Sequence, residues 1–280
     1  MNKLNVLGSY NYIEAYLTFA CGMGCHYCIN NYGSAPKYKS MKTDTWIQSL
    51  NRIRPNDGMP ITLGGGEPTM HTGFYDIVNN VRRDTNLDLL TNGTFDIREF
   101  MKKISPDRFK RGAKYASIRF SYHSGYSDTN MLLAKVCRMQ QEGYSVGIWA
   151  VVHPEVKRDI KKVQRMAEDI GIDFRVKEFL GMYKGKLYGT YKYKFALDCK
   201  LKDVMCKPSE LLIAPNGDIH RCHYWLYENK GCIGNICDSE VELLDKHVRC
   251  CDCGNCNPCD IKTKFNRFQE EGHCSVDIIK

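Results

Sequence analysis

Three cysteines, Cys21, Cys25 and Cys28, lie within eight consecutive residues, directly after an apolar run from Ile13 to Phe19. We expect the run to form a buried strand, because a short apolar segment followed by glycines is typical of a strand in a covered sheet. Two glycines between the first and second cysteines allow the loop to fold back tightly, so that the thiolates converge. Three soft thiolates suit an iron–sulfur cluster or zinc, and the metal position that they leave open is typical of a catalytic site. Half of a zinc site, or three thiols without a common ligand, are the alternatives.

The overall composition also indicates metal. The 280 residues include fifteen cysteines, 43% hydrophobic residues and 26% charged residues, which fits a globular chain with a sizeable core. No apolar run approaches the roughly 20 residues of a membrane span, and the start of the chain has no signal-peptide core. We therefore expect a cytoplasmic protein with no membrane partner, in which thiols stay reduced and serve metals rather than disulfides. The net charge of +8 mildly favours an anionic partner.

Strand-like and helix-like segments alternate through the first two thirds of the chain. The predicted strands are residues 13–19, 59–63, 87–90, 116–121, 145–152 and 173–180, and the predicted helices are 43–54, 74–83, 97–103, 131–142 and 155–170. Strands that alternate with helices are parallel, and right-handed crossovers wind them into a barrel or an open barrel. Ligands of such barrels bind at the carboxyl ends of the strands, near which Lys177 and Glu178 fall.

A glycine-rich turn, Gly64-Gly65-Gly66-Glu67-Pro68, follows the second predicted strand. Glycines at this place allow the backbone to approach a ligand closely, and a carboxylate there can bind an ammonium group. Taken alone, the turn is also compatible with an ordinary strand-to-helix connection.

Together, the two motifs resemble those of a known family. The spacing Cys-x3-Cys-x-aromatic-Cys, followed by Gly-Gly-Glu-Pro on the next strand, is similar to the cluster loop and GGEP motif of the radical S-adenosylmethionine (radical SAM) superfamily. The resemblance implies a [4Fe–4S] cluster on Cys21, Cys25 and Cys28, with S-adenosylmethionine (SAM) at the open iron. It also implies an α/β fold, a six-unit partial (β/α) barrel (a partial TIM barrel) over residues 1–182. The implied reaction is reductive cleavage of SAM to a 5′-deoxyadenosyl radical, which abstracts hydrogen from an unactivated position of the substrate.

The resemblance assigns further residues to SAM. Gly65, Gly66 and Glu67 would hold its methionine end, and Tyr27 would flank the adenine or the cluster loop. Ser121, at the end of the fourth predicted strand, would reach the ribose or the carboxylate. A flavodoxin- or ferredoxin-like electron donor would reduce the cluster.

Tyrosines and lysines interleave between residues 183 and 194. Aromatic rings can stack on bases while lysines hold phosphates, so the segment could contact nucleic acid. The alternative, which we favour, is a solvated linker or an edge strand whose lysines discourage pairing.

Eleven of the fifteen cysteines lie beyond residue 198. Residues 210–214 and 219–222 predict a β-hairpin, because the Asn-Gly pair between them suits a tight turn. Cys206 and Cys222 flank this hairpin and can meet at its open end.

The order Cys-x10-Gly-x4-Cys in this region resembles the SPASM or twitch extension of many radical SAM enzymes. The resemblance implies a small cysteine-rich extension over residues 183–280 with at least one auxiliary iron–sulfur cluster. Its implied ligands are Cys206, Cys222, Cys256 and Cys259. A structural zinc ribbon is the main alternative, and the other cysteines of the extension could hold a second cluster.

Three functions are compatible with these features. We favour a radical SAM oxidoreductase or maturase that acts on a small molecule or peptide. The second is a radical SAM enzyme that modifies a nucleobase in DNA or RNA, and the third is a non-catalytic cysteine-rich protein that binds metal and nucleic acid. A peptide maturase usually carries a leader-recognition domain, and only twenty residues precede Cys21, which adds weight to the second.

Overall fold

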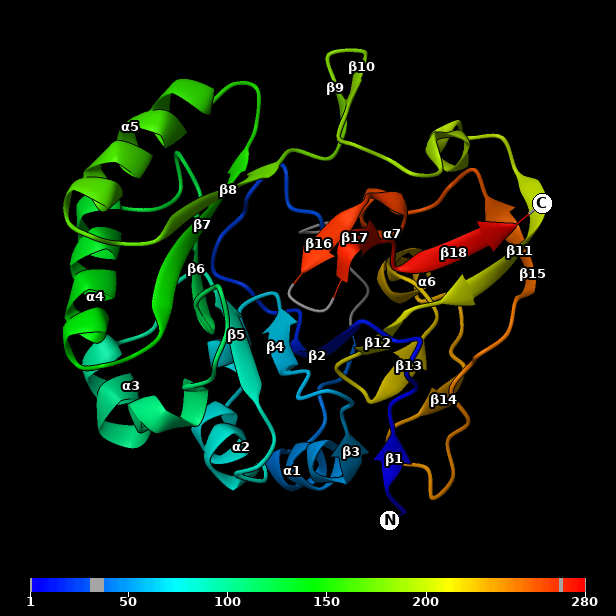
Figure 1. The fold of residues 1–280 in the computed structure, drawn as a ribbon, viewed down its shortest axis with the longest axis horizontal. Coiled ribbons are helices and arrows are strands. Elements are labelled where there is room, and N and C mark those ends of the chain that lie inside the picture. Colours follow the sequence, from blue (N-terminus) through cyan, green and yellow to red (C-terminus); the bar gives the residue numbers. More distant parts are fainter. Residues whose placement is uncertain (1, 31–37, 267–268, 280) are drawn as a thin grey trace.

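The computed structural model describes residues 2–30, 38–266 and 269–279. Its largest sheet has nine strands in the order β14-β13-β12-β2-β4-β5-β6-β7-β8 (Figure 1). Six neighbouring strands of this sheet are parallel. They are β2 (Tyr12–Thr18), β4 (Ile61–Gly65), β5 (Leu87–Thr91), β6 (Ile118–Tyr122), β7 (Val146–Val152) and β8 (Phe174–Glu178). The six predicted strands and the α/β fold are thus confirmed, with strand ends displaced by at most two residues.

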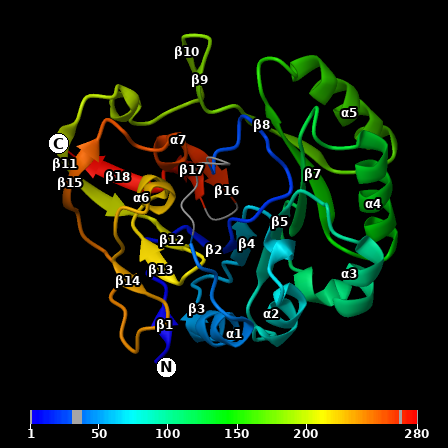
Figure 2. The ribbon, with the colours of Figure 1, turned by 180° about the vertical axis from the view of Figure 1, so that it is seen from behind.

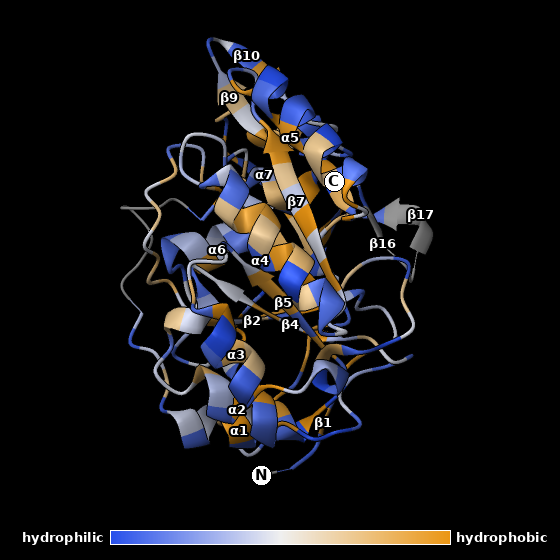
Figure 3. Cartoon of the chain, turned by 90° about the vertical axis from the view of Figure 1, so that its left-hand side faces the viewer, coloured by the Kyte–Doolittle hydropathy of each residue, from blue (hydrophilic) through white to orange (hydrophobic). Residues whose placement is uncertain are grey.

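Five helices connect these strands and cover one face of the sheet (Figure 2). They are α1 (Thr43–Arg52), α2 (Phe74–Asn80), α3 (Ile97–Lys103), α4 (Thr129–Gln141) and α5 (Lys157–Asp169). One continuous core joins strand residues such as Ile13 and Ile118 to helix residues such as Trp46 and Phe100. Figure 3 shows β7 as a mainly apolar strand behind the partly hydrophilic α4 and α5. Burial of this apolar face holds the barrel together.

The opposite face of the same strands is polar. Glu14 on β2, Thr62 on β4 and Asp88 on β5 are aligned across the sheet. Because successive side chains of a strand point to opposite faces, these three lie on the side away from the core residues. Arg119 on β6 lies on the same side and donates from Nη2 to Asp88 over 3.1 Å. The barrel interior is therefore polar and charged.

The predicted hairpin is present and extends the barrel sheet. Its strands are β12 (Glu210–Ile213) and β13 (Asp218–His220), and the short β14 (Gly234–Asn235) pairs with β13. The turn uses Gly217 at φ +91°, a conformation that favours glycine. β12 pairs in parallel with β2, so a segment near residue 210 lies beside one near residue 12. The second strand was predicted to reach Cys222, but it ends at His220, and Cys222 instead precedes the helix α6 (His223–Glu228).

The rest of the cysteine-rich region forms a second, smaller layer beside β12 and β13 (Figure 1). Its three-stranded antiparallel sheet has the order β15-β11-β18. The strands are β11 (Lys202–Pro208), β15 (Val248–Cys253) and β18 (Val276–Ile279), and the short helix α7 (Pro258–Ile261) follows β15. This layer has a small hydrophobic core of its own, which includes Val204, Ile261 and Ile278.

Short elements complete the chain. β1 (Leu4–Asn5) pairs with β3 (Ile53–Arg54), β9 (Gly181–Tyr183) with β10 (Lys186–Tyr188), and β16 (Lys264–Asn266) with β17 (Gln269–His273). Single 3₁₀ turns lie at Pro68–Met70, Pro106–Phe109 and Lys194–Leu197. The β9–β10 hairpin projects from the body of the molecule (Figure 1). Within the described ranges, no helix has the length and apolar character needed to cross a bilayer.

Candidate active site

The three cysteines of the first motif come together on one loop after β2. The backbone N–H of Gly66 donates to Thr18 O and that of Glu67 to Ala20 O, each over 2.8 Å, so the start of the loop is fastened to the end of β4. Cys25 is buried, and burial together with the thiols of Cys28 and Cys21 raises the pKa of Cys25 to about 11. The backbone N–H of Cys28 donates to Cys25 O over 3.1 Å, so the loop turns back on itself between these two cysteines.

The surroundings of these thiols fit thiolate ligands. Cys21 Sγ accepts from the backbone N–H of Met23 over 3.4 Å and from Asn92 Nδ2 over 3.5 Å. Hydrogen bonds to the charged form favour a thiolate, and thiolates are the ligands of iron–sulfur clusters. Cys21 and Cys28 are half-buried while Cys25 is buried, so the loop has one side toward the protein and one toward solvent.

Gly65 and Gly66 lie where the end of β4 touches the cluster loop. A Cβ on Gly65 would lie 2.2 Å from Thr18 O, and one on Gly66 would lie 2.4 Å from Ala20 O. Gly65 also has φ +125°. Any larger residue would push the loop away from the strand, so the glycines set the position of the three thiols.

Glu67 lies directly after these glycines, but its carboxylate is directed into the protein. The residue is fully buried and accepts hydrogen bonds from Thr69 Oγ1 (2.6 Å), Thr91 Oγ1 (2.9 Å) and the backbone N–H of Asn92 (2.7 Å). Burial raises the pKa of the carboxyl, and these hydrogen bonds oppose the shift. In this arrangement Glu67 joins the ends of β4 and β5.

Tyr27 belongs to a group of rings at the carboxyl ends of β6 and β7. Its ring stacks on His153 at 5.4 Å between centroids and 20° between planes, and it meets His26 edge-on at 5.0 Å. The hydroxyl lies 3.2 Å from His123 Nδ1. Burial lowers the pKa of His123 to about 4, which makes a neutral imidazole the form present near pH 7. Sequence reasoning found Tyr27 but did not assign a role to His26 or His153.

Ser121 lies near the carboxyl end of β6, opposite Trp149 on β7, and is half-buried. This is the strand end at which it was predicted.

Lys177 on β8 reaches into the barrel interior. The residue is solvent-exposed overall, and its ammonium forms no hydrogen bond or ion pair among the described residues. Desolvation, followed by the positive charges of Arg119 and Lys262, lowers the pKa of Lys177 to about 7. The charges of Cys259 and Glu14 also act on its ammonium and oppose part of this lowering of the pKa. An amine in that state can bind an anion when protonated or accept a proton when neutral.

A second group of cysteines lines a small cavity between β11, β15 and α6. Its cysteines are Cys206, Cys222, Cys250 and Cys256. Arg221 Nη2 donates to Cys250 Sγ over 3.3 Å. The hydrogen bond from the Cys206 thiol and the Arg221 guanidinium lower the pKa of Cys250. Four thiols around one cavity, with a cation beside them, fit a thiolate-ligated metal centre.

Three of the four cysteines predicted for this centre therefore meet, and Cys259 does not line the cavity. Cys259 is half-buried, near Lys264, Lys262 and Glu210. The helix α7 begins between Cys256 and Cys259, with Asn257 Oδ1 accepting from the Cys259 N–H over 2.9 Å, and this turn separates the two thiols. Cys250 lines the cavity as well.

The fold is a partial barrel of six parallel strands, with three thiols and a glycine-rich edge at the carboxyl ends of its first two strands. Residues 16–124 match the family model described as "Radical SAM superfamily". The match runs from the end of β2 to the end of β6 and includes both motifs, while the cysteine-rich extension lies outside it.

Two curated relatives match parts of the chain. The 7-carboxy-7-deazaguanine synthase of Clostridium acetobutylicum is 27% identical over 93 residues, which are 32% of this chain and 41% of the relative. The GTP 3′,8-cyclase of Clostridium perfringens is 21% identical over 212 residues, 72% of this chain and 64% of the relative. The chain thus spans less than two thirds of either relative.

Two solved structures share the fold. The structure of anSMEcpe with bound AdoMet superposes with a TM-score of 0.59 at 16% identity, covering 82% of this chain and 78% of that one. The structure of Streptococcus suis SuiB bound to S-adenosylmethionine gives a TM-score of 0.56 at 13% identity, with 84% and 63% covered.

Proposed function

We propose that Cys21, Cys25 and Cys28 hold the [4Fe–4S] cluster and that SAM binds beside it, along the edge formed by Gly65 and Gly66. When bound, the cluster and SAM supply a 5′-deoxyadenosyl radical, which abstracts hydrogen from an unactivated position of the substrate. The observation that carries this proposal is the closeness of the three thiols on a loop fastened to the glycine-rich strand end. An electron donor of flavodoxin or ferredoxin type reduces the cluster.

The chain's own residues orient and enclose the cofactors. Tyr27, held between His153 and His123, forms an aromatic wall beside the cluster loop. Ser121 offers a hydroxyl to SAM from β6. Glu67 has a positioning role. Its carboxylate accepts from the backbone N–H of Asn92, and the side chain of Asn92 donates to Cys21 Sγ.

The substrate is a small molecule or a peptide that presents an acidic group to the barrel interior. Lys177 and Arg119 support this class, since both are cations of the interior strand face and Lys177 forms no ion pair within 4 Å among the described residues. One relative is named for GTP, and SuiB has been solved with a precursor peptide, so proteins with this fold span both substrate classes.

The extension, residues 183–280, holds one auxiliary iron–sulfur cluster. We assign its ligands to Cys206, Cys222, Cys250 and Cys256, because these thiols line one cavity. Arg221 would balance part of the negative charge of a thiolate-bound cluster.

The experiment is anaerobic reconstitution with iron and sulfide, followed by a deoxyadenosine assay with reductant and SAM. Wild-type protein is expected to form 5′-deoxyadenosine, and Cys25→Ala is expected to lose it. Cys137→Ala is the matched control, since Cys137 packs on the helical core of α4, away from both cysteine groups. Protein that binds iron but never cleaves SAM would refute the proposal.

A further inference from the structure

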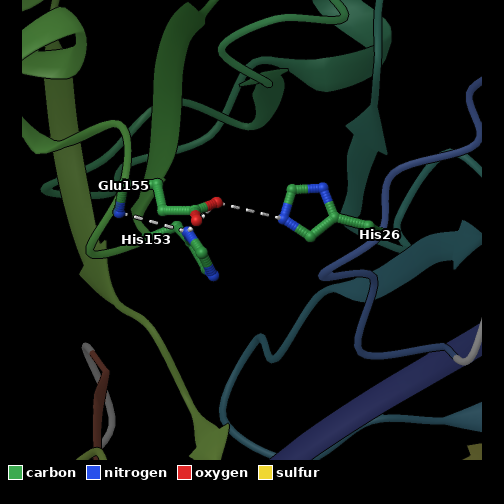
Figure 4. Close-up of side chains that lie close together, drawn as sticks. All are labelled: His26, His153 and Glu155. Carbon is green, nitrogen blue, oxygen red and sulfur yellow. Dashed lines mark hydrogen bonds and ion pairs between the residues drawn. The ribbon is translucent and has the colours of Figure 1, made fainter. Parts of the chain in front are cut away.

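Three metal-binding side chains converge at the rim of the barrel, outside both cysteine groups. Figure 4 shows His26, His153 and Glu155 directed toward one another from two different loops. Their ligand atoms all lie within 4.8 Å of one another. Glu155 Oε2 lies 4.0 Å from His26 Nε2 and 4.0 Å from His153 Nδ1.

Each of the three groups presents an acceptor to the common point. Tyr126 OH accepts from the His26 backbone N–H and lies 3.0 Å from His26 Nδ1. In the tautomer whose Nδ1–H donates to this hydroxyl, Nε2 carries the lone pair and faces Glu155. His153 Nδ1 accepts weakly from the Glu155 N–H over 3.4 Å, so its lone pair also faces this side. Tyr183 donates its hydroxyl to Glu155 Oε1 and leaves Oε2 for the two imidazoles.

With both imidazoles in this state, two lone pairs and a carboxylate oxygen face one point, and a cation between them would remove their mutual repulsion. A bound ion would replace the long hydrogen bond from the Glu155 N–H to His153 Nδ1. Lys184 does not fill this role, because its ammonium lies 3.7 Å from the other oxygen, Oε1. His153 is 1% exposed, so water cannot solvate its inward nitrogen freely.

The geometry points to a site for a divalent transition-metal ion, bound by His26 Nε2, His153 Nδ1 and Glu155 Oε2. Two imidazoles and one carboxylate, with further positions open to water, suit Mn²⁺, Fe²⁺ or Zn²⁺. Bonds of about 2.1 Å require ligand atoms roughly 3.4 Å apart. The two pairs at 4.0 Å must therefore shorten by about 0.6 Å, and a pair at the 4.8 Å limit by about 1.4 Å. Side-chain exposures of 56% for His26 and 48% for Glu155 open a path for the ion from solvent.

Metal ligands in proteins are usually held by hydrogen bonds or packing on the side away from the ion, and the three residues have such contacts. Hydrogen bonds to the far side of a ligand fix its tautomer and direction, and here Tyr126 serves His26 while Tyr183 serves Glu155. His153 is fixed by rings, since it stacks on Tyr27 and meets Phe179 edge-on at 4.6 Å.

The ion would tie together three parts of the rim. His26 lies on the cluster loop, His153 and Glu155 lie between β7 and α5, and Tyr183 is the last residue of β9. Binding would therefore hold the Tyr27–His153 stack in place beside the cluster loop. This site does not depend on the proposed radical chemistry, because its ligands are nitrogen and oxygen and its occupancy can be measured without turnover.

The test is titration of the anaerobically reconstituted enzyme with Mn²⁺, followed by electron paramagnetic resonance of the free ion. Mn²⁺ is the probe because it prefers nitrogen and oxygen to thiolate, and the oxidised [4Fe–4S] cluster is diamagnetic. We expect one saturable ion per chain. Glu155→Gln and His26→Gln should weaken it at least tenfold, and Tyr126→Phe about 10-fold or more through the lost outer hydrogen bond.

His247→Gln is the matched control, because His247 also faces a carboxylate, Asp277 at 3.1 Å, but without a second imidazole. It should bind Mn²⁺ as the wild type does. Bound Mn²⁺ should also show electron spin-echo modulation from two imidazole nitrogens. Absence of saturable binding in the wild type, or equal affinity in Glu155→Gln and His26→Gln with iron content preserved, would overturn the assignment.

Discussion

Arg221 donates to Cys250 Sγ over 3.3 Å, while its guanidinium lies 3.5 Å from the ring centroid of Trp225. Stacking on Trp225 fixes the position of the Arg221 guanidinium. The guanidinium then contacts the thiol of Cys250 among the closely spaced cysteines of this region. Trp225 is held in turn by a hydrogen bond from Nε1 to Asp252 over 3.0 Å. This relationship is the structural ground for placing Cys250 in the auxiliary centre.

The first prediction separates Cys250 from Cys259. In a background with Cys21, Cys25 and Cys28 replaced by alanine, the extension should retain an iron–sulfur spectrum after anaerobic reconstitution. Cys250→Ser should abolish this residual iron, because it removes one of the four thiols that line the cavity. Cys259→Ser, the control from the same run, should retain it. Loss of iron in Cys259→Ser with retention in Cys250→Ser would restore the ligand set inferred from sequence.

The group of Cys21, Cys25 and Cys28 was easier to predict from sequence than the cysteine group of the extension, because its residues are close together along the chain. The spacing of three cysteines and the glycine-rich turn constrain a single loop and the adjacent strand end, and both lie close together along the chain. In contrast, Cys250, Cys253, Cys256 and Cys259 recur at equal spacing and look equivalent. The start of α7 at Pro258 and the pairing of β15 with β11 decide which of them share a cavity.

Two further features could not be predicted from the sequence, because they depend on contacts between segments far apart in the chain. The hairpin was predictable from its Asn-Gly turn, but no local pattern indicates that β12 pairs with β2, about two hundred residues away in sequence. The convergence of His26 with His153 and Glu155 is of the same kind, since it depends on how the cluster loop and the end of β7 meet. Alternating apolar residues predicted the strands themselves because burial of one face requires that pattern.

A second prediction concerns the glycine-rich edge. Gly66→Ala should prevent normal assembly of the radical SAM cluster, because the new Cβ would lie 2.4 Å from Ala20 O and 2.5 Å from Phe19 O. Gly22→Ala, within the cluster loop itself, meets nothing within 4 Å and should keep the wild-type iron content. Iron and sulfide analysis after reconstitution checks both. Equal iron content in the two variants would contradict a positioning role for Gly66.

A third prediction concerns Glu67. Glu67→Gln replaces a carboxylate oxygen with an amide NH₂ that cannot accept from the backbone N–H of Asn92 or Thr69. Leaving a buried donor unpaired costs about 1–3 kcal/mol, so the urea midpoint should fall measurably. Glu99→Gln is the control, because that carboxylate pairs with Lys103 on the surface of α3. Such exposed pairs contribute roughly 0–1 kcal/mol. Equal midpoints for the two variants would show that Glu67 does not brace β4 and β5.

A fourth prediction follows from the lowered pKa of Lys177, about 7 in the folded protein against 10.5 for an ordinary lysine. Between these two pH values the unfolded chain binds more protons than the fold, so the contribution of Lys177 to stability rises with pH across that window. Below pH 7 Lys177 is protonated in both the folded and the unfolded chain, and the cost of desolvating its charge then lowers the stability of the fold in full. Lys177→Met should therefore raise the melting temperature most at pH 6 and less at pH 9.

The comparison for that experiment is Lys102→Met on the exposed surface of α3. Its effect on the melting temperature should be small and the same at pH 6 and pH 9. If the effect of Lys177→Met on the melting temperature did not depend on pH, the pKa of Lys177 would not be lowered in the folded protein.

The last prediction concerns the interleaved tyrosines and lysines between residues 183 and 194. Three of the rings contact other rings of the chain: Tyr183 meets His153 edge-on at 4.7 Å, Tyr188 meets Phe179 at 6.0 Å and Tyr193 meets Phe195 at 6.2 Å. Tyr183 is held by Glu155. Rings engaged in this way are not free to stack on bases, so we expect no measurable affinity for DNA or RNA at moderate salt.

Fluorescence anisotropy with labelled single-stranded DNA and RNA over a range of salt concentrations checks this expectation. Glutamine at the four lysines, Lys184, Lys186, Lys192 and Lys194, should leave both the binding signal and SAM cleavage unchanged. A phosphate-tracking surface would behave differently, because each neutralised phosphate releases counterions and makes affinity fall steeply with salt. A steep slope in the wild type that flattens in the four-lysine variant would therefore establish a nucleic-acid contact and redirect the search for the substrate toward nucleobases.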